Sequence, residues 1–175
     1  MKDESYDKYV VKDNRSLRKK LFPNLPNYHY VSRAIYLKRN CNECVRVLDV
    51  GAGPLKNITN WKKNNINEVY AIEPSKDYYL EGLKNIEKSK MKNIKLFWGV
   101  GELDWEGGEA GLDSKNKKLF KKCFKNVLFN CITFEFSIHY MINNYVQLLE
   151  NINRHSMKGT KLLIYTLDGE FLYNF

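Results

Sequence analysis

The sequence predicts an α/β fold in which a mostly parallel sheet carries helices on both faces. Short apolar runs alternate with helical segments along the chain, a pattern that produces parallel strands joined by right-handed crossovers. The first apolar run, 45–50, passes directly into the turn Gly51-Ala52-Gly53, and the second ends in Glu73. Parallel sheets bind ligands at the carboxyl ends of their strands, so both features mark the expected site.

The N-terminal residues predict a basic arm over 1–26 ahead of one domain over 27–175. The arm is polar, carries a cluster of arginines and lysines at positions 15–20, and ends at Pro23 and Pro26, which we expect to break any helix there. A first helix is expected over 28–38.

The remaining elements follow from hydrophobic pattern and capping signals. The expected strands are 45–50, 68–72, 94–98, 126–134 and 161–167. Expected helices cover 56–63, 76–88 with Ser75 as N-cap, 119–122, and 143–155 with Val146, Leu149 and Ile152 facing inward. The stretch 102–118 is rich in Gly, Glu and Lys, and most of it is expected to be a loop.

Composition indicates a globular chain that attracts polyanions. Its 175 residues are 43% hydrophobic, with a net charge of +9 and a pI near 9.3. Such an excess favours a nucleic-acid partner, although an AT-rich genome would also enrich lysine. No apolar run approaches the roughly 20 residues that span a bilayer, and the first residues form no signal-peptide core. We therefore expect an intracellular protein with no membrane partner.

The four cysteines are expected to be reduced thiols. Cys41 and Cys44 have the spacing of a zinc or redox half-site, but Cys123 and Cys131 are too far apart to supply the second half. Cys131 lies in an apolar run and is expected in the core. We expect no metal site.

A cofactor site is expected around the glycine turn. Asp49 ends the first strand, Gly51 and Gly53 allow close approach of a ligand, and Glu73 can accept both hydroxyls of a ribose. This pattern is typical of class I, Rossmann-like S-adenosylmethionine (SAM) methyltransferases. A nicotinamide or flavin site would carry Gly-x-Gly-x-x-Gly, and position 56 is Lys.

The segment after the fourth strand carries aromatic, acidic and imidazole groups together. Phe136 and Tyr140 can stack on a base, His139 can bond a base edge, and Glu135 can accept from the cofactor side. In a structural interpretation, His139 would only support the fold.

The run Phe134–Tyr140 resembles the Gln-Phe-x-x-His-Tyr motif of mRNA cap guanine-N7 methyltransferases. The following helix and the run 162–169, which ends in Thr-x-Asp-Gly, are most similar to the capping enzymes of large, poxvirus-like DNA viruses. The resemblance implies SAM contacts from Asp49, Gly51, Gly53, Glu73 and Glu135, and a guanine pocket of Phe136, His139 and Tyr140.

It also implies catalysis by positioning, without a catalytic acid or base, and a GpppRNA substrate. Other capping-enzyme domains or a stimulatory subunit would be partners, in host cytoplasm or virion. The chain departs from the family after the first strand, where Pro54-Leu55-Lys56-Asn57 replaces Lys-Gly-Gly-Asp, and it stops where further strands are expected. A degenerate binding or regulatory subunit, and a SAM enzyme acting on tRNA, a small molecule or a protein, remain alternatives.

Overall fold

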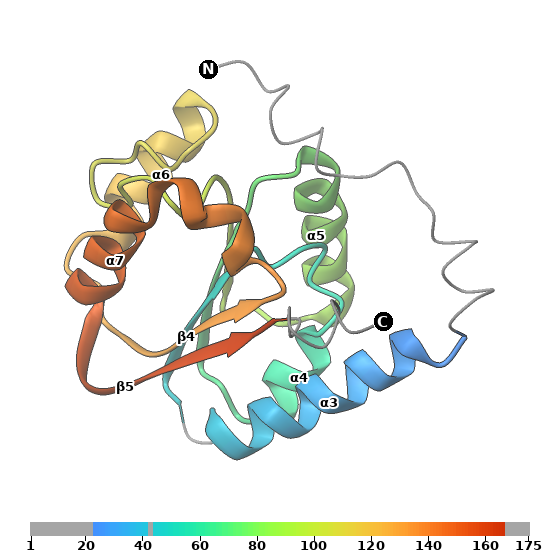
Figure 1. Ribbon diagram of the computed structural model, residues 1–175. Coiled ribbons are helices and arrows are strands. Elements are labelled where there is room, and N and C mark those ends of the chain that lie inside the picture. The colour runs from blue at the N-terminus through green and yellow to red at the C-terminus, as the bar shows by residue number, and fades with distance from the viewer. Residues whose placement is uncertain (1–22, 42–43, 167–175) are drawn as a thin grey trace.

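A five-stranded parallel sheet forms the centre of the molecule (Figure 1). The computed structural model describes residues 23–41 and 44–166. The strands lie in the order β3-β2-β1-β4-β5. Their bounds are β1 Arg46–Val50, β2 Glu68–Glu73, β3 Ile94–Trp98, β4 Phe129–Glu135 and β5 Ser156–Tyr165. The predicted α/β class and the parallel sheet are therefore confirmed.

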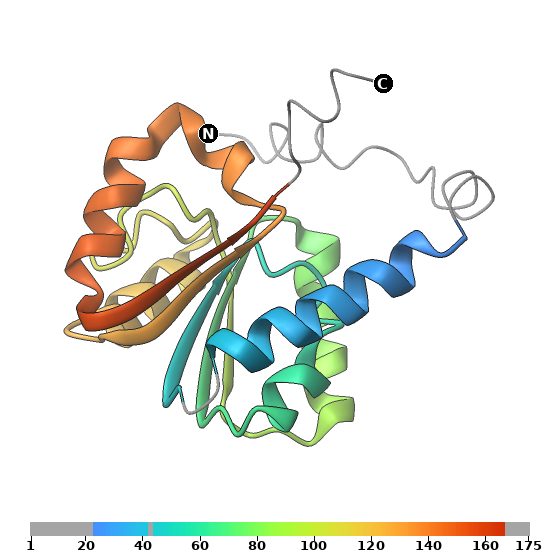
Figure 2. The same ribbon diagram turned by 60° about the horizontal axis from the view of Figure 1, so that its bottom comes forward.

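Helices cover both faces of this sheet, as the sequence predicts (Figures 1 and 2). The first face carries α3 Leu25–Asn40, α4 Ile58–Lys63 and α5 Lys76–Ser89, and the second carries α6 Ser114–Phe124, η1 Ile138–Asn144 and α7 Tyr145–Arg154. The second face holds the larger core, in which aromatic side chains of the strands and α6 pack together, among them Tyr70, Phe97, Phe120, Phe124 and Phe129. Together with the buried residues under α3, α4 and α5 on the first face, this core fixes the strands whose ends form the site.

Strand pleating sorts the side chains of β1 onto opposite faces. Leu48 and Val50 enter the core under α6 and α7, whereas Val47 enters the core under α3. Asp49 lies on the same face as Val47, because side chains alternate along a strand. The parallel register sets Asp49 beside Ala71 of β2 and Thr133 of β4. The acids two residues further along these strands therefore lie on that same face.

The first helix differs from its sequence prediction. It begins at Leu25, and Pro26 lies inside its first turn rather than breaking it. The first turn of a helix has no intrahelical partner for its N–H groups, so proline is tolerated there. The expected arm over 1–26 otherwise falls outside the described residues.

Helix α6 contains the short helix expected over 119–122 and extends it at both ends, so 114–118, at the end of the expected loop, are helical. Asp113 is its N-cap, and the side chain accepts a hydrogen bond of 2.6 Å from the backbone N–H of Asn116. Phe120 and Phe124, four residues apart, are fully buried. The loop prediction was wrong for 114–118 only, because the cap and the two buried aromatic residues outweigh the low apolar content of that stretch.

The last two strands are displaced from their expected bounds. β4 starts at Phe129, because the chain first turns at Asn126 with a φ of 58°. β5 begins at Ser156 rather than at 161, and Gly159, with a φ of 91°, lies in its irregular first half. The expected strand residue 167 and the Asp168-Gly169 motif lie outside the described residues.

The predicted inner face of the helix over 143–155 is partly wrong. A 3-10 helix occupies 138–144, and α7 follows it. Leu148 and Asn151 are buried and Ile152 packs against the core, whereas Val146 and Leu149 are each 56% exposed. The apolar stripe of this helix is wider than the surface it covers, so periodicity alone did not select the buried side.

The cysteines form a buried thiol cluster. Cys41, Cys44 and Cys131 are buried, which confirms the core position predicted for Cys131, and Sγ of Cys41 lies 2.8 Å from Sγ of Cys131. Within 23–41 and 44–166, no group of His, Cys, Asp and Glu has the geometry of a metal site. In the same ranges, no helix has the length and apolar character needed to cross a membrane.

Candidate active site

The glycine turn after β1 is shaped by two different constraints. Gly51 has a φ of 76°, and a Cβ built there would lie 2.3 Å from the Cβ of Ser137. The hydroxyl of Ser137 donates a hydrogen bond to the Val50 carbonyl, which joins the segment after β4 to the end of β1. Gly53 has a φ of 59° but no atom within 4 Å of the Cβ position. The turn is therefore closed at Gly51 and open at Gly53.

Glu73 holds this turn from the end of β2. Its Oε2 accepts from the N–H of Gly53 at 2.7 Å, and its Oε1 accepts from the N–H of Ser75 at 2.7 Å. The side chain is buried, and this burial raises the pKa of Glu73 to about 7 despite the two hydrogen bonds. A carboxylate has about four acceptor positions, so both oxygens retain capacity for a ligand.

Asp49 is a buried acid whose partners are absent from the described residues. It is 1% exposed, and neither carboxylate oxygen has a hydrogen-bond partner there. Burial raises the pKa of Asp49 well above its usual value, and the charge of Glu135 adds to this effect. Because buried polar groups are nearly always hydrogen-bonded, this carboxyl group indicates a place for a donor.

Glu135 connects the sheet to α3 and α4. Its Oε2 accepts from Nη1 of Arg33 at 3.1 Å and from Nδ2 of Asn57 at 3.1 Å. Burial raises the pKa of Glu135, whereas Arg33 lowers it. Nε of Arg33 is buried and unpartnered among the described residues.

Together these groups form a carboxylate-rich site. Asp49, Glu73 and Glu135 come from three adjacent strands, and the one cation that acts on Asp49 and Glu135 is Arg33. Three carboxyls against one guanidinium favour a ligand that carries positive charge and hydrogen-bond donors. The structure thus brings together every acid that the sequence assigned to the cofactor.

The aromatic residues after β4 are divided between two groups. Phe136 has a φ of 57°, and its ring packs 4.9 Å from His29 and 4.7 Å from Tyr165, with Arg33 above it at 5.6 Å. This places Phe136 on the side of α3 and β5.

His139 and Tyr140 lie further along, in η1. Their ring centroids are 4.0 Å apart, and both side chains are exposed. The guanine pocket of Phe136, His139 and Tyr140 stays a prediction, since the contacts seen here place Phe136 in a different cluster from the other two.

Some residues of the site gave no clear sequence signal. Only the fold brings Arg33 to Glu135, and Ser32 to a 2.8 Å contact with the Tyr165 hydroxyl. Ser137 and Asn57 were not selected at all, because their roles depend on strand pairing across 78 to 87 residues.

Three solved structures share this architecture. A methyltransferase from Pyrococcus furiosus matches with a TM-score of 0.56 and 22% identity, over 83% of this chain and 66% of its own. A SAM-dependent methyltransferase from Clostridium acetobutylicum matches with a TM-score of 0.58 and 18% identity, over 91% and 56%. An O-methyltransferase of a Brevibacillus brevis polyketide synthase, in complex with S-adenosyl-L-homocysteine, matches with a TM-score of 0.57 and 20% identity. The match covers 83% of this chain and 46% of that protein.

The fold is that of class I SAM-dependent methyltransferases. This confirms the fold class that the sequence predicts. SAM is the cofactor of this fold class, and the three acids of the site lie at the carboxyl ends where an open α/β sheet binds its ligand.

One relative is similar in sequence. The probable cobalt-precorrin-6B C(15)-methyltransferase (decarboxylating) of Methanococcus vannielii is 28% identical over 116 residues, which are 61% of this chain and 61% of the relative. No family model matches the chain. The chain thus spans about three fifths of this relative and about half to two thirds of the three solved structures.

Proposed function

We propose that this chain is a SAM-dependent methyltransferase domain and that its methyl acceptor is the guanine N7 of capped RNA. The observation that carries the first part is Asp49, a buried carboxyl with two unpartnered oxygens beside an open glycine turn. The second part rests on the resemblance of the segment around His139 and Tyr140 to cap methyltransferases.

The residues of the site fit SAM. Asp49 and Glu135 offer acceptors to its ammonium group, Glu73 offers acceptor positions to its ribose hydroxyls, and Arg33 offers donors to its carboxylate. Gly51 and Gly53 keep the backbone of the turn free of side chains toward it. When bound, SAM supplies an electrophilic methyl group on a sulfonium, which an acid-rich site stabilises.

The acceptor would be held on the side of η1. His139 and Tyr140 present an exposed, paired imidazole and phenol in the segment that follows Glu135. Aromatic rings stack on unpaired bases, and a ring nitrogen can bond a base edge. Guanine N7 is already nucleophilic, so these groups would act by orienting it rather than by removing a proton.

The surroundings of the reaction follow from the same resemblance. GpppRNA would be the substrate, and the charge of +9 would assist its binding. Other domains of a viral capping enzyme, or a stimulatory subunit, would complete the assembly in host cytoplasm or virion.

A small-molecule acceptor is the second candidate. The precorrin methyltransferase similarity covers 116 residues at 28% identity, and it favours a methyltransferase that acts on a metabolite rather than on RNA. The candidate predicts cofactor binding without any transfer to RNA.

Calorimetric titration with SAM, with Asp49→Asn as the matched variant, tests the cofactor. We expect binding by the wild type and a loss of at least tenfold in affinity in the variant. Absence of binding by the wild type at any protein concentration would identify a degenerate binding domain and contradict the proposal.

Transfer of labelled methyl to GpppRNA and ApppRNA, followed by nuclease digestion, tests the acceptor. We expect 7-methylguanosine from GpppRNA only, with His139→Ala and Tyr140→Ala slowing transfer while the SAM affinity stays within twofold. Cofactor binding with no product from either RNA would favour the small-molecule acceptor. An equal loss of transfer and SAM affinity in both variants would show that these residues support the fold.

A further inference from the structure

Helix α6 carries more unbalanced positive charge than the other long helices near the site, of which α3 has three basic residues and no acid. Its sequence SKNKKLFKKCF contains five lysines and no acid, and Lys125 follows it as the C-cap. Helix α5, KDYYLEGLKNIEKS, contains three lysines and three acids. A general enrichment in lysine raises charge everywhere, so the contrast between the helices marks α6 as a distinct surface.

The core holds α6 in place independently of its lysines. Phe120 and Phe124 are fully buried, stack on each other with centroids 5.1 Å apart, and pack against Phe97 of the sheet. All lysines of the helix are exposed. Their charge can therefore be removed without opening the core.

Three of these lysines form a stripe. Lys115, Lys118 and Lys122 have the spacing i, i+3 and i+7, which places them on one side of the helix. With Ser114 and Leu119 they line a surface depression of about 390 Å³. Among residues 23–41 and 44–166, no salt bridge involves any lysine of α6, although Lys115 lies near the carboxylate of Asp113.

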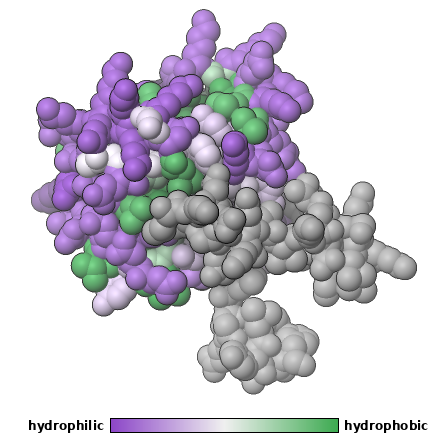
Figure 3. Space-filling view, turned by 90° about the horizontal axis from the view of Figure 1, so that it is seen from above, coloured by the Kyte–Doolittle hydropathy of each residue, from purple (hydrophilic) through white to green (hydrophobic). Residues whose placement is uncertain are grey.

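The stripe begins at the same edge of the sheet as the candidate active site. Just before α6, the N–H of Leu112 donates to the carbonyl of Trp98 at 3.2 Å, at the end of β3. Gly99 follows Trp98 in the chain, and its N–H donates to the carbonyl of Glu73, an acid of the candidate site, at 3.1 Å. Helix α6 lies near the top of Figure 1, and Figure 3 shows the molecule from above. Outside the grey residues, hydrophilic side chains dominate this face.

The chemistry of this surface favours phosphate over protein. Lysine is depleted in protein–protein interfaces, which are built around apolar and aromatic anchors, and the depression offers no aromatic side chain. Lysines that face a nucleic-acid backbone instead gain from the release of counterions. The stripe covers about 10 Å of helix length. Each of its three lysines can neutralise one phosphate, so about three phosphate contacts are expected.

We propose that the lysine stripe of α6, Lys115, Lys118 and Lys122, binds the phosphate backbone of an RNA strand. The stripe would hold the chain beyond the reacting nucleotide and would add affinity without reading sequence. This inference rests on the RNA acceptor of the proposed function for its biological role, but the binding itself requires neither SAM nor a methyl transfer.

Fluorescence anisotropy with a labelled single-stranded RNA tests the stripe, with KCl varied from about 50 to 200 mM. The test variant is Lys115→Gln/Lys118→Gln/Lys122→Gln. The control is Lys84→Gln/Lys88→Gln/Lys92→Gln, which removes the same charge from exposed positions on and just after α5. Each single-strand phosphate contact contributes about 0.7 to the magnitude of the slope of log K against log salt. We therefore expect the slope of the test variant to be smaller in magnitude than that of the wild type by about 2. The control should lose much less.

Equal losses in both variants would show that total charge acts rather than the stripe, and no loss in either would show that the lysines are only solvated. Both results overturn the proposal, as does equal competition by polyglutamate at matched charge. Lys115→Arg/Lys118→Arg/Lys122→Arg should restore the slope. Thermal melting of each variant verifies folding, and the absence of SAM separates a failure here from a failure of the methyltransferase proposal.

Discussion

The carboxylate of Glu73 accepts a 2.7 Å hydrogen bond from the N–H of Gly53, so the acid that ends β2 holds the turn that follows β1. A second bond, from the N–H of Ser75, ties the same carboxylate to the N-cap of α5. The residue assigned to the ribose therefore also shapes the glycine turn. Its protonation state links cofactor chemistry to the stability of the fold.

Glu73→Gln should remove a pH dependence from the stability of the ligand-free protein. Burial raises the pKa of Glu73 to about 7, from 4.5. The folded state then holds its proton more tightly, so the contribution of Glu73 is fully present below pH 4.5 and is lost as pH rises through 7. Urea unfolding should show the wild type losing up to roughly 3 kcal/mol more than the variant between those limits. Parallel pH profiles would contradict the raised pKa.

Asp49→Asn should leave the ligand-free protein as stable as the wild type or more stable at pH 8, while weakening SAM binding at least tenfold. The wild-type carboxyl is buried without a partner, and removing such a charge relieves a cost of about 1 kcal/mol or more. Urea unfolding and SAM titration measure the two effects. A large destabilisation would show that Asp49 holds the fold, and would argue against its role as a ligand group.

Gly51→Ala should destabilise the protein far more than Gly53→Ala. Both positions have positive φ, so an alanine at either one is strained by about 1 kcal/mol. Only at Gly51 does the new methyl group meet another atom, the Cβ of Ser137 at 2.3 Å, so we expect a total cost of about 3 kcal/mol there. Urea unfolding of both variants measures the difference. Ser137→Gly should recover part of the loss in the Gly51 variant, and a failure to do so would argue against this contact.

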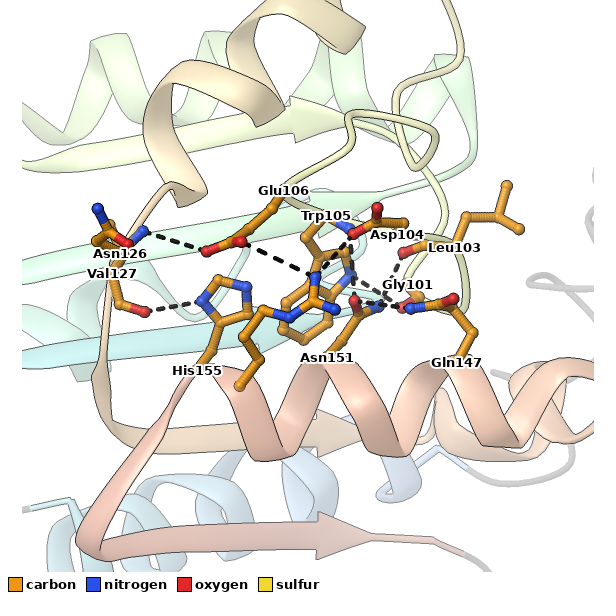
Figure 4. Close-up of polar contacts among 11 residues, drawn as sticks. Gly101, Leu103, Asp104, Trp105, Glu106, Asn126, Val127, Gln147, Asn151 and His155 are labelled. Atoms are coloured by element: carbon orange, nitrogen blue, oxygen red, sulfur yellow. Dashed lines mark hydrogen bonds and ion pairs between the residues drawn. The ribbon is translucent and has the colours of Figure 1, made fainter.

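His155 should make the protein sensitive to acid. It is fully buried at the end of α7, where Nδ1 contacts the Val127 carbonyl at 2.7 Å and Nε2 has no partner among the described residues (Figure 4). The ring lies 5.2 Å from Trp105 and 5.6 Å from Phe124. Burial lowers the pKa of His155, although the carbonyl and nearby Glu106 oppose this.

Because the folded pKa lies below 6.5, the stability that a neutral His155 contributes is present above pH 6.5 and is lost as pH falls. His155→Phe fills the aromatic site and loses one hydrogen bond, at a cost of about 1 kcal/mol that does not depend on pH. Unfolding of both proteins from pH 7.5 down to about 5 should therefore bring their stabilities together. A constant difference across that range would show that His155 does not titrate on folding.

Much of the site followed from local sequence patterns. The run that ends at Val50, the turn at Gly51 and the acid Glu73 were placed correctly, because a buried parallel strand is a continuous apolar run and its end is marked by glycine or by charge. The elements and buried residues of the second half of the chain were predicted less accurately. The start of helix α6, 114–118, was taken for a loop, and Val146 and Leu149 were assigned to the core although they are exposed.

The sequence by itself determined the class of fold, the succession of strands and helices along the chain, and the three acids of the candidate cofactor site. These depend on periodicity and on residues at strand ends, which are local properties. Tertiary structure alone decided that Arg33 meets Glu135 and that Ser137 closes on Gly51. The members of these pairs lie 102 and 86 residues apart in the chain, by the difference of their numbers. Their contacts therefore depend on strand register and helix docking, which no local pattern encodes.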